Sequence, residues 1–273
     1  MNKLIALAAA AATLLGMSLP PARAAYTILP PGAVVAGKSI ADWTADWWTW
    51  GLQAPEISSP LTDPTGGFAH VNNNGPVFFI AGQTFTRQFT VPFGKPILLP
   101  IINLFDVEPA PASPPPTLAE RVAATQVVLS AWEGSVVIAS LFATIDGTTV
   151  SAPESYLEES GLFDMGPVQK KSHIQALFGL PTGTGTFPTK STGYWLMITD
   201  LSVGTHELHF GGRSESFVFP DNCCNSGTFP EYSTDTFDTI VVTPEPATLV
   251  LLGVSSVGLV ALRRRRRAES TVA

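Results

Sequence analysis

The chain has 273 residues, of which 45% are hydrophobic and 14% charged, and it contains 23 glycines and 24 prolines. Residues 25–243 carry eight basic against twenty acidic side chains, a net charge of −12, which argues against nucleic acid and anionic lipid as partners. The glycine and proline content predicts many turns between short strands rather than a helical bundle.

The first 24 residues have the pattern of a secretory signal peptide. A short positive start precedes an apolar run, Leu4 to Met17, that is too short to span a membrane comfortably, and Ala22-Arg23-Ala24 is a small-x-small cleavage site. We expect cleavage before Ala25. Residues 25–242 then form the exported domain.

A helix is predicted to begin after Ser39 and to run to about Leu52, because Ser39 and Asp42 form a capping box. Three tryptophans recur at helical spacing and share one face: Trp43, Trp47 and Trp50. Such a stripe either packs against a sheet, which we favour, or offers a platform on which sugar rings stack. Trp48 points away from the stripe, so we select it as a candidate ligand contact.

Three β-favouring runs follow, at residues 76–81, 84–90 and 96–102. The middle run alternates, and Arg87 lies between two phenylalanines on its core-facing side. We expect Arg87 to pair with a buried carboxylate such as Asp106 or Asp63. The alternative places Arg87 at the rim of a pocket, as a second candidate ligand contact.

This part of the chain resembles a group of uncharacterised exported bacterial proteins. The similarity covers about residues 39–106 and rests on the tryptophan-rich helix and on four further features: Gly75-Pro76-Val77-Phe78-Phe79, Arg87, Val91-Pro92-Phe93-Gly94-Lys95 and Leu99-Pro100-Ile101-Ile102-Asn103. Members of the group often have a cysteine pair near the positions of His70 and Phe89, which this chain lacks. The resemblance implies no activity for this chain, because the group is uncharacterised.

Residues 108–116 are too rich in proline for a helix or a sheet interior, and we expect a surface loop within one domain rather than a linker. A second capping box begins at Thr117 and opens a helix to about Trp132, with Gly134 placed to end it. Asp146-Gly147 between two short β runs predicts a tight hairpin.

Residues 151–190 read as loop-rich, and their carboxylates lack the spacing of a calcium loop. Three further strands are expected, at residues 194–201, 205–210 and 235–242. His206 and His209 fall three positions apart on one of them, which puts them on opposite faces and argues against a shared metal ion. We expect no metal site and no cofactor.

Cys223 and Cys224 are the only cysteines, so no third cysteine exists to close an ordinary loop. Outside the cell three states remain open: a vicinal disulfide, which we slightly favour, two free thiols, or an intermolecular bridge. The neighbouring polar residues and glycine indicate an exposed turn.

The C-terminal segment, residues 243–273, combines three parts in a fixed order. The first part is the short motif Pro244, Glu245 and Pro246. Residues 247–262 carry no charge and as a helix cover about 24 Å, slightly less than a hydrocarbon core of about 30 Å, so we predict a marginal transmembrane helix. Five arginines follow and act as a cytoplasmic membrane stop: Arg263, Arg264, Arg265, Arg266 and Arg267.

These three parts resemble the PEP-CTERM sorting tail of bacterial exosortase substrates. The resemblance implies export and temporary anchoring in the inner membrane by the C-terminal helix. It also implies recognition of the Pro244–Pro246 motif by a membrane-embedded exosortase, removal of the tail, and delivery to the cell surface or to an extracellular polysaccharide matrix. It implies nothing about the domain that is carried.

The sequence contains no catalytic motif of the serine-hydrolase, zinc-protease or phosphate-loop kind, so no catalytic residue is assigned. We expect a mainly β fold, an antiparallel β-sandwich of jelly-roll-like topology with two packed helices. The expected role is non-enzymatic, as a surface or matrix protein that associates with polysaccharide or has a structural function. The alternative is a secreted hydrolase of polysaccharide with its site near Asp42, Asp46 and Arg87.

Overall fold

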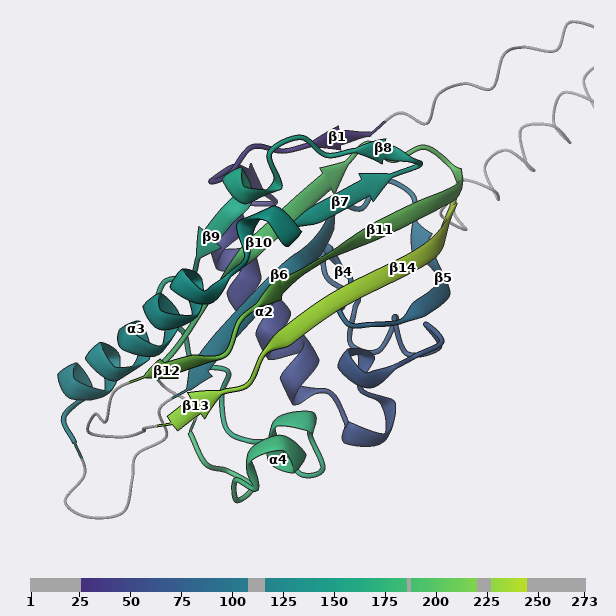
Figure 1. Ribbon diagram of the computed structural model, residues 1–273. Helices are drawn as coiled ribbons and strands as arrows, with labels where there is room; N and C mark the ends of the chain where they lie inside the picture. Colours follow the sequence, from purple (N-terminus) through teal and green to yellow (C-terminus); the bar gives the residue numbers. More distant parts are fainter. Residues whose placement is uncertain (1–25, 108–115, 186–187, 220–226, 245–273) are drawn as a thin grey trace, which may run out of the picture.

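The computed structural model describes residues 26–107, 116–185, 188–219 and 227–244. The predicted signal peptide, residues 108–115 of the predicted surface loop at 108–116, both cysteines and the chain beyond Pro244 lie outside these residues. The described part is mainly β, as predicted, with three helices and two five-stranded sheets (Figure 1).

Sheet 1 has the strand order β1-β10-β6-β4, and β9 also pairs with β10. Its strands are β1 (Thr27–Ile28), β4 (Phe78–Phe79), β6 (Ile97–Val107), β9 (Leu157–Glu159) and β10 (Thr189–Thr199). The long strands β6 and β10 form its centre, and both are buried along almost their whole length. Their near-continuous burial indicates that both faces of sheet 1 are covered.

Sheet 2 has the strand order β5-β14-β11-β7-β8. Its strands are β5 (Thr86–Pro92), β7 (Phe142–Ile145), β8 (Thr148–Thr149), β11 (Gly204–Ser214) and β14 (Tyr232–Thr243). Residues along β5 and β14 alternate between buried and exposed, so sheet 2 has one core face and one solvent face.

Two further strand pairs are small: β2 (Val34–Val35) with β3 (Lys38–Ser39), and β12 (Phe217–Phe219) with β13 (Gly227–Phe229).

The expectation of antiparallel sheets was wrong for two strand pairs. β4 runs parallel to β6 in sheet 1, and β5 runs parallel to β14 in sheet 2. A short turn joins β5 to β6, but the two strands enter different sheets, so each pairs with a strand from elsewhere in the chain. An all-antiparallel jelly roll therefore does not describe this topology.

Both predicted helices are present, and a third was not predicted. α2 spans Ile40–Gln53 and α3 spans Leu118–Ser135, and each begins with the predicted capping box. α3 runs through Gly134, which was expected to end it, and its cap is Val136. The short α4 (His173–Phe178) lies in the region that was read as loop, where no periodic stretch is long enough to signal a helix.

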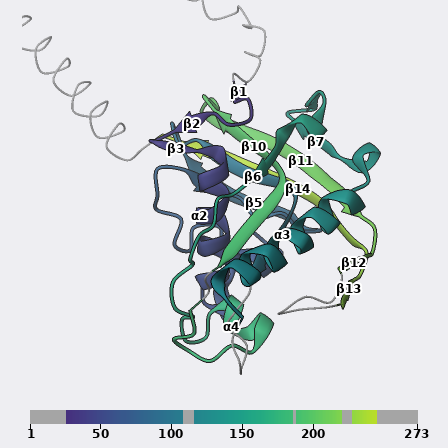
Figure 2. The same ribbon diagram turned by 90° about the vertical axis from the view of Figure 1, so that its left-hand side faces the viewer.

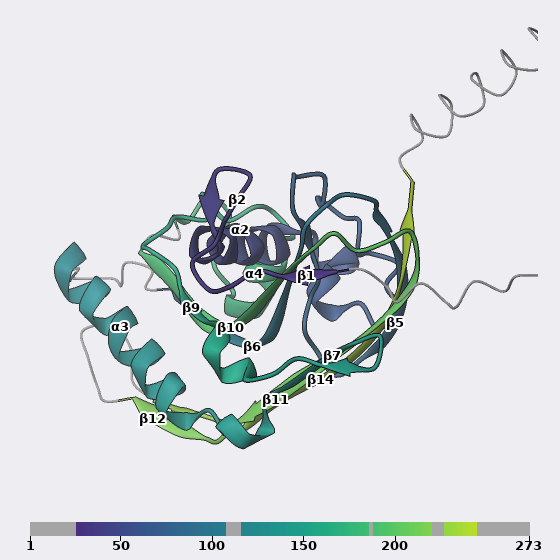
Figure 3. The ribbon, with the colours of Figure 1, turned by 90° about the horizontal axis from the view of Figure 1, so that it is seen from above.

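The core has two parts, which together arrange the elements in layers (Figures 2 and 3). One cluster lies between the sheets and takes side chains from β6 and β10 on one side and from β11 and β14 on the other, with α3 contributing Val128 and Trp132. The second cluster joins α2 to the opposite face of sheet 1 through residues such as Leu98 and Trp195. The domain therefore has three layers, in the order α2, sheet 1 and sheet 2.

Candidate ligand-binding cavity

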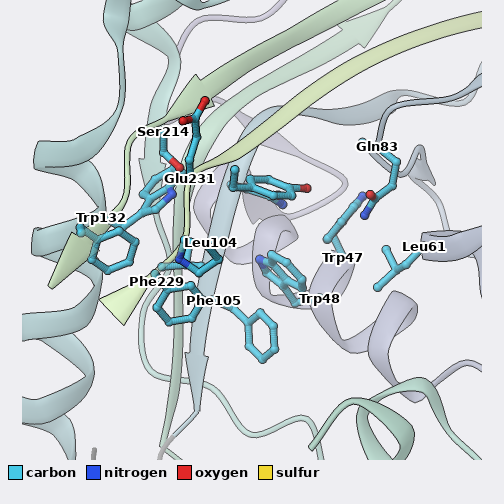
Figure 4. A pocket seen from close by; sticks show the side chains of 15 residues that line it. Trp47, Trp48, Leu61, Gln83, Leu104, Phe105, Trp132, Ser214, Phe229 and Glu231 are labelled. Carbon is cyan, nitrogen blue, oxygen red and sulfur yellow. The ribbon is translucent and has the colours of Figure 1, made fainter. Parts of the chain in front are cut away.

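A cavity of about 290 Å³ lies between α2, the second half of β6, α3 and the segment from the end of β11 to the start of β14 (Figure 4). Its aromatic lining comes from six elements: Trp47 and Trp48 of α2, Phe105 of β6, Trp132 of α3, Phe217 of β12, Phe229 of β13 and Tyr232 of β14. The other lining residues are Leu61, Gly82, Gln83, Asn103, Leu104, Ser214, Pro230 and Glu231. Figure 4 shows Trp132 on one side of the cavity and Trp47, Gln83 and Leu61 on the other.

The helical spacing of the tryptophans in α2 turns one stripe toward sheet 1. Trp43, Trp47 and Trp50 are buried, and each indole nitrogen donates to a backbone carbonyl: Val35 at 2.8 Å, Ile80 at 2.8 Å and Val71 at 2.7 Å. The favoured interpretation, packing against a sheet, is confirmed. The stripe is not an exposed sugar-stacking platform, because its rings are buried, although Trp47 also contributes to the cavity lining.

Trp48 is held differently from the stripe. Its side chain is also buried, with 8% of its surface exposed, but its indole Nε1 has no hydrogen-bond partner. The ring packs against Phe105, with 4.4 Å between ring centroids, and edge-on against Trp47, with 4.8 Å. Trp48 therefore contributes a fixed aromatic ring to the cavity lining, and its indole nitrogen is a buried donor without a partner.

Asn103 supplies a second donor of the same kind. It lies on β6 opposite Gly193 of β10, is 8% exposed, and its Nδ2 has no hydrogen-bond partner. A buried donor without a partner costs about 1–3 kcal/mol. Two such donors in the lining of one cavity are the arrangement expected where a bound molecule completes the hydrogen bonds.

The paired strands β12 and β13 supply two aromatic side chains to the cavity lining. Phe217 and Phe229 stack there with 5.1 Å between ring centroids and an angle of 5° between the rings. Tyr232 follows at the start of β14, and burial raises the pKa of its hydroxyl to about 12, although the residue as a whole keeps contact with solvent. The tyrosine hydroxyl is therefore protonated and can both donate and accept.

Arg87 pairs with a buried carboxylate, as expected, but the partner is Asp238 rather than Asp106 or Asp63. Its Nε and Nη2 donate to the two oxygens of Asp238 at 2.8 and 2.7 Å, and Nη2 also donates to the Ala81 carbonyl at 2.5 Å. These bonds occupy the guanidinium within the core. Arg87 is not among the residues that line the 290 Å³ cavity.

The residues of the alternative hydrolase site have separate partners. Asp42 accepts hydrogen bonds from Ser39 in the capping box, and Asp46 pairs with Lys38 at 2.6 Å. Neither carboxylate lines the cavity, whose only carboxylate among the described lining residues is Glu231, paired with Arg213 at 3.3 Å. The structure does not bring Asp42, Asp46 and Arg87 together.

The two histidines of β11 lie on opposite faces, as predicted. His206 is buried, and its Nδ1 and Nε2 lie 2.8 Å from the Asp146 carboxylate and from the Ser202 carbonyl. His209 is on the solvent face, where its Nε2 lies 2.8 Å from Asp235. Ser202, His206 and Asp146 have the composition of a catalytic triad, but the nearest Nε2 partner is the carbonyl oxygen, while the Ser202 hydroxyl is 3.5 Å away. We read this cluster as structural.

The last described strand runs directly into the short motif at Pro244. β14 ends at Thr243, whose carbonyl accepts a hydrogen bond of 2.8 Å from the amide of Phe93. Residues 242–266 match the PEP-CTERM protein-sorting motif. The chain thus carries the sorting signal of exported proteins that exosortase processes, and the signal begins inside β14. None of the curated proteins and none of the solved structures compared with the chain matches it.

Several features that the sequence predicts lie outside the described residues. They are Glu245 and Pro246, the helix at 247–262, Arg263–Arg267, the signal peptide at 1–24, and the cysteines Cys223 and Cys224. None of the helices in the described part of the chain has the length and hydropathy of a membrane span. Among these same residues no cluster of three His, Cys, Asp or Glu side chains is arranged to hold a metal ion.

Trp48 was selected from sequence and lies in the cavity lining, whereas Asn103, Trp132 and the residues of β12–β14 were missed. Asn103 follows a strongly apolar run within β6, and in the sequence nothing distinguishes it from an ordinary strand residue. Trp132 and Phe229 come from distant parts of the chain. No local pattern signals that these side chains share one space.

Proposed function

We propose that residues 25–242 form one non-enzymatic binding domain, a sandwich of two sheets, which the sorting tail delivers to the cell surface or extracellular matrix. We propose further that the aromatic cavity binds a sugar residue of a matrix polysaccharide. The observation that carries this proposal is the pair of buried donors without partners, Trp48 Nε1 and Asn103 Nδ2, in an aromatic lining.

The composition of the lining supports a saccharide ligand. Aromatic rings pack against the apolar faces of pyranose rings, and a few placed polar groups then fix the orientation of the sugar. Trp48 and Asn103 supply donors to hydroxyl or ring oxygens, and the Tyr232 hydroxyl supplies either role. A volume of about 290 Å³ is near the lower end of ligand pockets, roughly 300–1,000 Å³, and favours one sugar ring or a chain end over a stretch of polymer.

Binding without hydrolysis is supported by the distribution of carboxylates. Cleavage of a glycosidic bond ordinarily uses two carboxylates, about 5–10 Å apart, on either side of that bond. Of the described residues that line the cavity only Glu231 is a carboxylate, and it pairs with Arg213. This arrangement favours a domain that holds a sugar and releases it unchanged.

The proposal is tested with the full-length protein in lipid nanodiscs, titrated with oligosaccharides released from the matrix of the producing cells. We expect Trp48→Phe, which keeps an aromatic ring but removes the N–H donor, to weaken binding about tenfold, the equivalent of one hydrogen bond. Asn103→Leu should weaken it by a similar factor. His209→Ala, on the opposite face of sheet 2, is the matched control and should bind like the wild type.

Two results would count against a saccharide ligand. Equal affinity of the wild type and both cavity variants would remove the cavity from the binding site. Saturable binding of an apolar dye without competition from any oligosaccharide would keep the cavity as a binding site but assign it to an apolar molecule.

A further inference from the structure

The junction between the folded domain and the sorting tail is very short. Three residues, Pro244 to Pro246, separate the end of β14 from the apolar segment that starts at Ala247. Four residue steps at 3.3–3.6 Å span at most about 14 Å. The headgroup layer on each side of a bilayer takes about 5–8 Å of this distance. Before the tail is removed, the end of β14 is therefore held within about 9 Å of the lipid headgroups.

The strand register identifies which surface surrounds that end of β14. Thr243 pairs with Pro92, the last residue of β5, and Val242 pairs with Gly204, the first residue of β11. Two turns therefore flank the junction: residues 93–96 after β5 and residues 200–203 before β11. We call these two turns the junction surface.

The beginning of the exported domain lies at the same end of the molecule. Thr27 of β1 pairs with Thr199, the residue directly before the turn at 200–203. β1 and the end of β14 accordingly lie at one end of the sheets (Figure 1). The signal peptide and the sorting tail both continue from this end, so the chain is tied to the membrane on the side of the junction surface at either stage of export.

Two large apolar side chains are exposed on the junction surface. Phe93 is 48% exposed and Val203 is 51% exposed, one on each turn. Phe93 also donates its amide hydrogen to the Thr243 carbonyl, so its turn is fixed directly to the last residue of β14. Apolar side chains that are held at a bilayer surface gain free energy by entering the boundary between headgroups and acyl chains.

We propose that the junction surface rests on the lipid bilayer in the unprocessed protein, with Phe93 and Val203 in the headgroup region. The tail enforces this contact, because the acidic domain has no general attraction to a membrane. The contact fixes the orientation of the domain, with β11 standing away from the bilayer and the cavity about 30 Å from it. The contact depends on the sorting tail and not on the proposed saccharide binding, so a failure of one leaves the other standing.

The test uses the full chain, after signal removal, in phosphatidylcholine vesicles that contain nitroxide-labelled phosphatidylcholine. All variants carry Cys223→Ser and Cys224→Ser, and each receives one new cysteine with an environment-sensitive fluorophore. Phe93→Cys and Val203→Cys probe the junction surface. The matched controls are Phe178→Cys and Val218→Cys, which are 49% and 69% exposed and lie beyond the opposite ends of the sheets.

We expect a blue shift and strong quenching by the nitroxide lipid at positions 93 and 203, and neither effect at positions 178 and 218. Equal quenching at all four positions, or none, in protein that floats with the vesicles would overturn the proposal. A blue shift at 93 and 203 without quenching would also overturn it, because the apolar surroundings of the fluorophore would then be protein rather than lipid. Protein that fails to float would show that the tail does not hold the domain at a bilayer.

Discussion

Arg87 and Asp238 lie side by side on the parallel strands β5 and β14 and form an ion pair with two hydrogen bonds on the core side of sheet 2. Only 4% of the Arg87 side chain and none of the Asp238 side chain are exposed. The guanidinium also donates to the Ala81 carbonyl, so the pair joins three segments of the chain. This one contact ties the last strand of the domain to its first third.

Breaking this pair should destabilise the protein strongly. We expect Asp238→Asn to cost about 3–5 kcal/mol in the free energy of unfolding, because it leaves the Arg87 charge buried without its partner. The double variant Arg87→Leu with Asp238→Leu should cost less than the sum of the single variants. Urea unfolding of the four proteins gives the coupling energy. As a control, Lys38→Ala removes the exposed pair with Asp46 and should change stability by less than about 1 kcal/mol.

The neighbouring tryptophans Trp47 and Trp48 should respond differently to the same substitution. Trp47→Phe leaves the Ile80 carbonyl without its donor, which costs about 1–3 kcal/mol in addition to the lost packing. Trp48→Phe removes a donor that has no partner, so only the packing loss remains. Thermal unfolding of the ligand-free protein compares the two variants. Equal losses would show that Trp48 Nε1 makes a hydrogen bond that the structure lacks.

Glu158 should make stability depend on pH. Burial raises the pKa of its carboxyl above 4.5, although the Gly32 amide donates to it at 2.6 Å. The folded protein then binds a proton more tightly than the unfolded chain, so stability falls as the pH rises from 4.5 through the folded-state pKa. Glu158→Gln should remove this fall and be more stable than the wild type at pH 7. Urea unfolding of the two proteins at pH 4.5 and at pH 7 measures this difference. The exposed Glu154→Gln should follow the wild-type profile.

Substitution by alanine should have opposite effects on stability at Gly193 and at Gly134. A Cβ at Gly193 would lie 2.6 Å from the Asn103 Cβ and 2.8 Å from the Ile102 carbonyl oxygen, so Gly193→Ala should cost about 1–3 kcal/mol. A Cβ at Gly134 meets nothing within 4 Å, and in α3 Gly134→Ala should stabilise by about 0.5–1 kcal/mol. Midpoints of thermal unfolding separate the two. Stabilisation by Gly193→Ala would mean that β6 and β10 are further apart than described.

The features that sequence predicted well depend on residues close together in the chain. A capping box requires residues three apart, and both helices begin where Ser39 and Thr117 indicate. Asp146-Gly147 forms the predicted hairpin turn, with positive φ at both residues. The alternation of β5 placed Arg87 on the core side.

The features that sequence missed depend on which strands become neighbours. The partner of Arg87 is 151 residues away, and its choice follows from the parallel register of β5 and β14, which no local pattern encodes. The cavity was missed for the same reason, because its aromatic lining comes from α2, β6, α3 and the last three strands, which are far apart in the chain. Trp48 could be selected because it breaks a periodic stripe, whereas nothing nearby distinguishes Asn103.

The position of β14 sets an order of events during export. This strand lies between β5 and β11 in sheet 2, yet it is the last strand of the described chain. A chain that crosses the membrane from its N-terminus delivers β14 only when the sorting segment has arrived. Until then sheet 2 lacks an inner strand and Arg87 lacks its partner, so the domain cannot complete its core. A chain interrupted before residue 232 would lack this inner strand and the partner of Arg87, so we expect it to be degraded more readily than the complete domain.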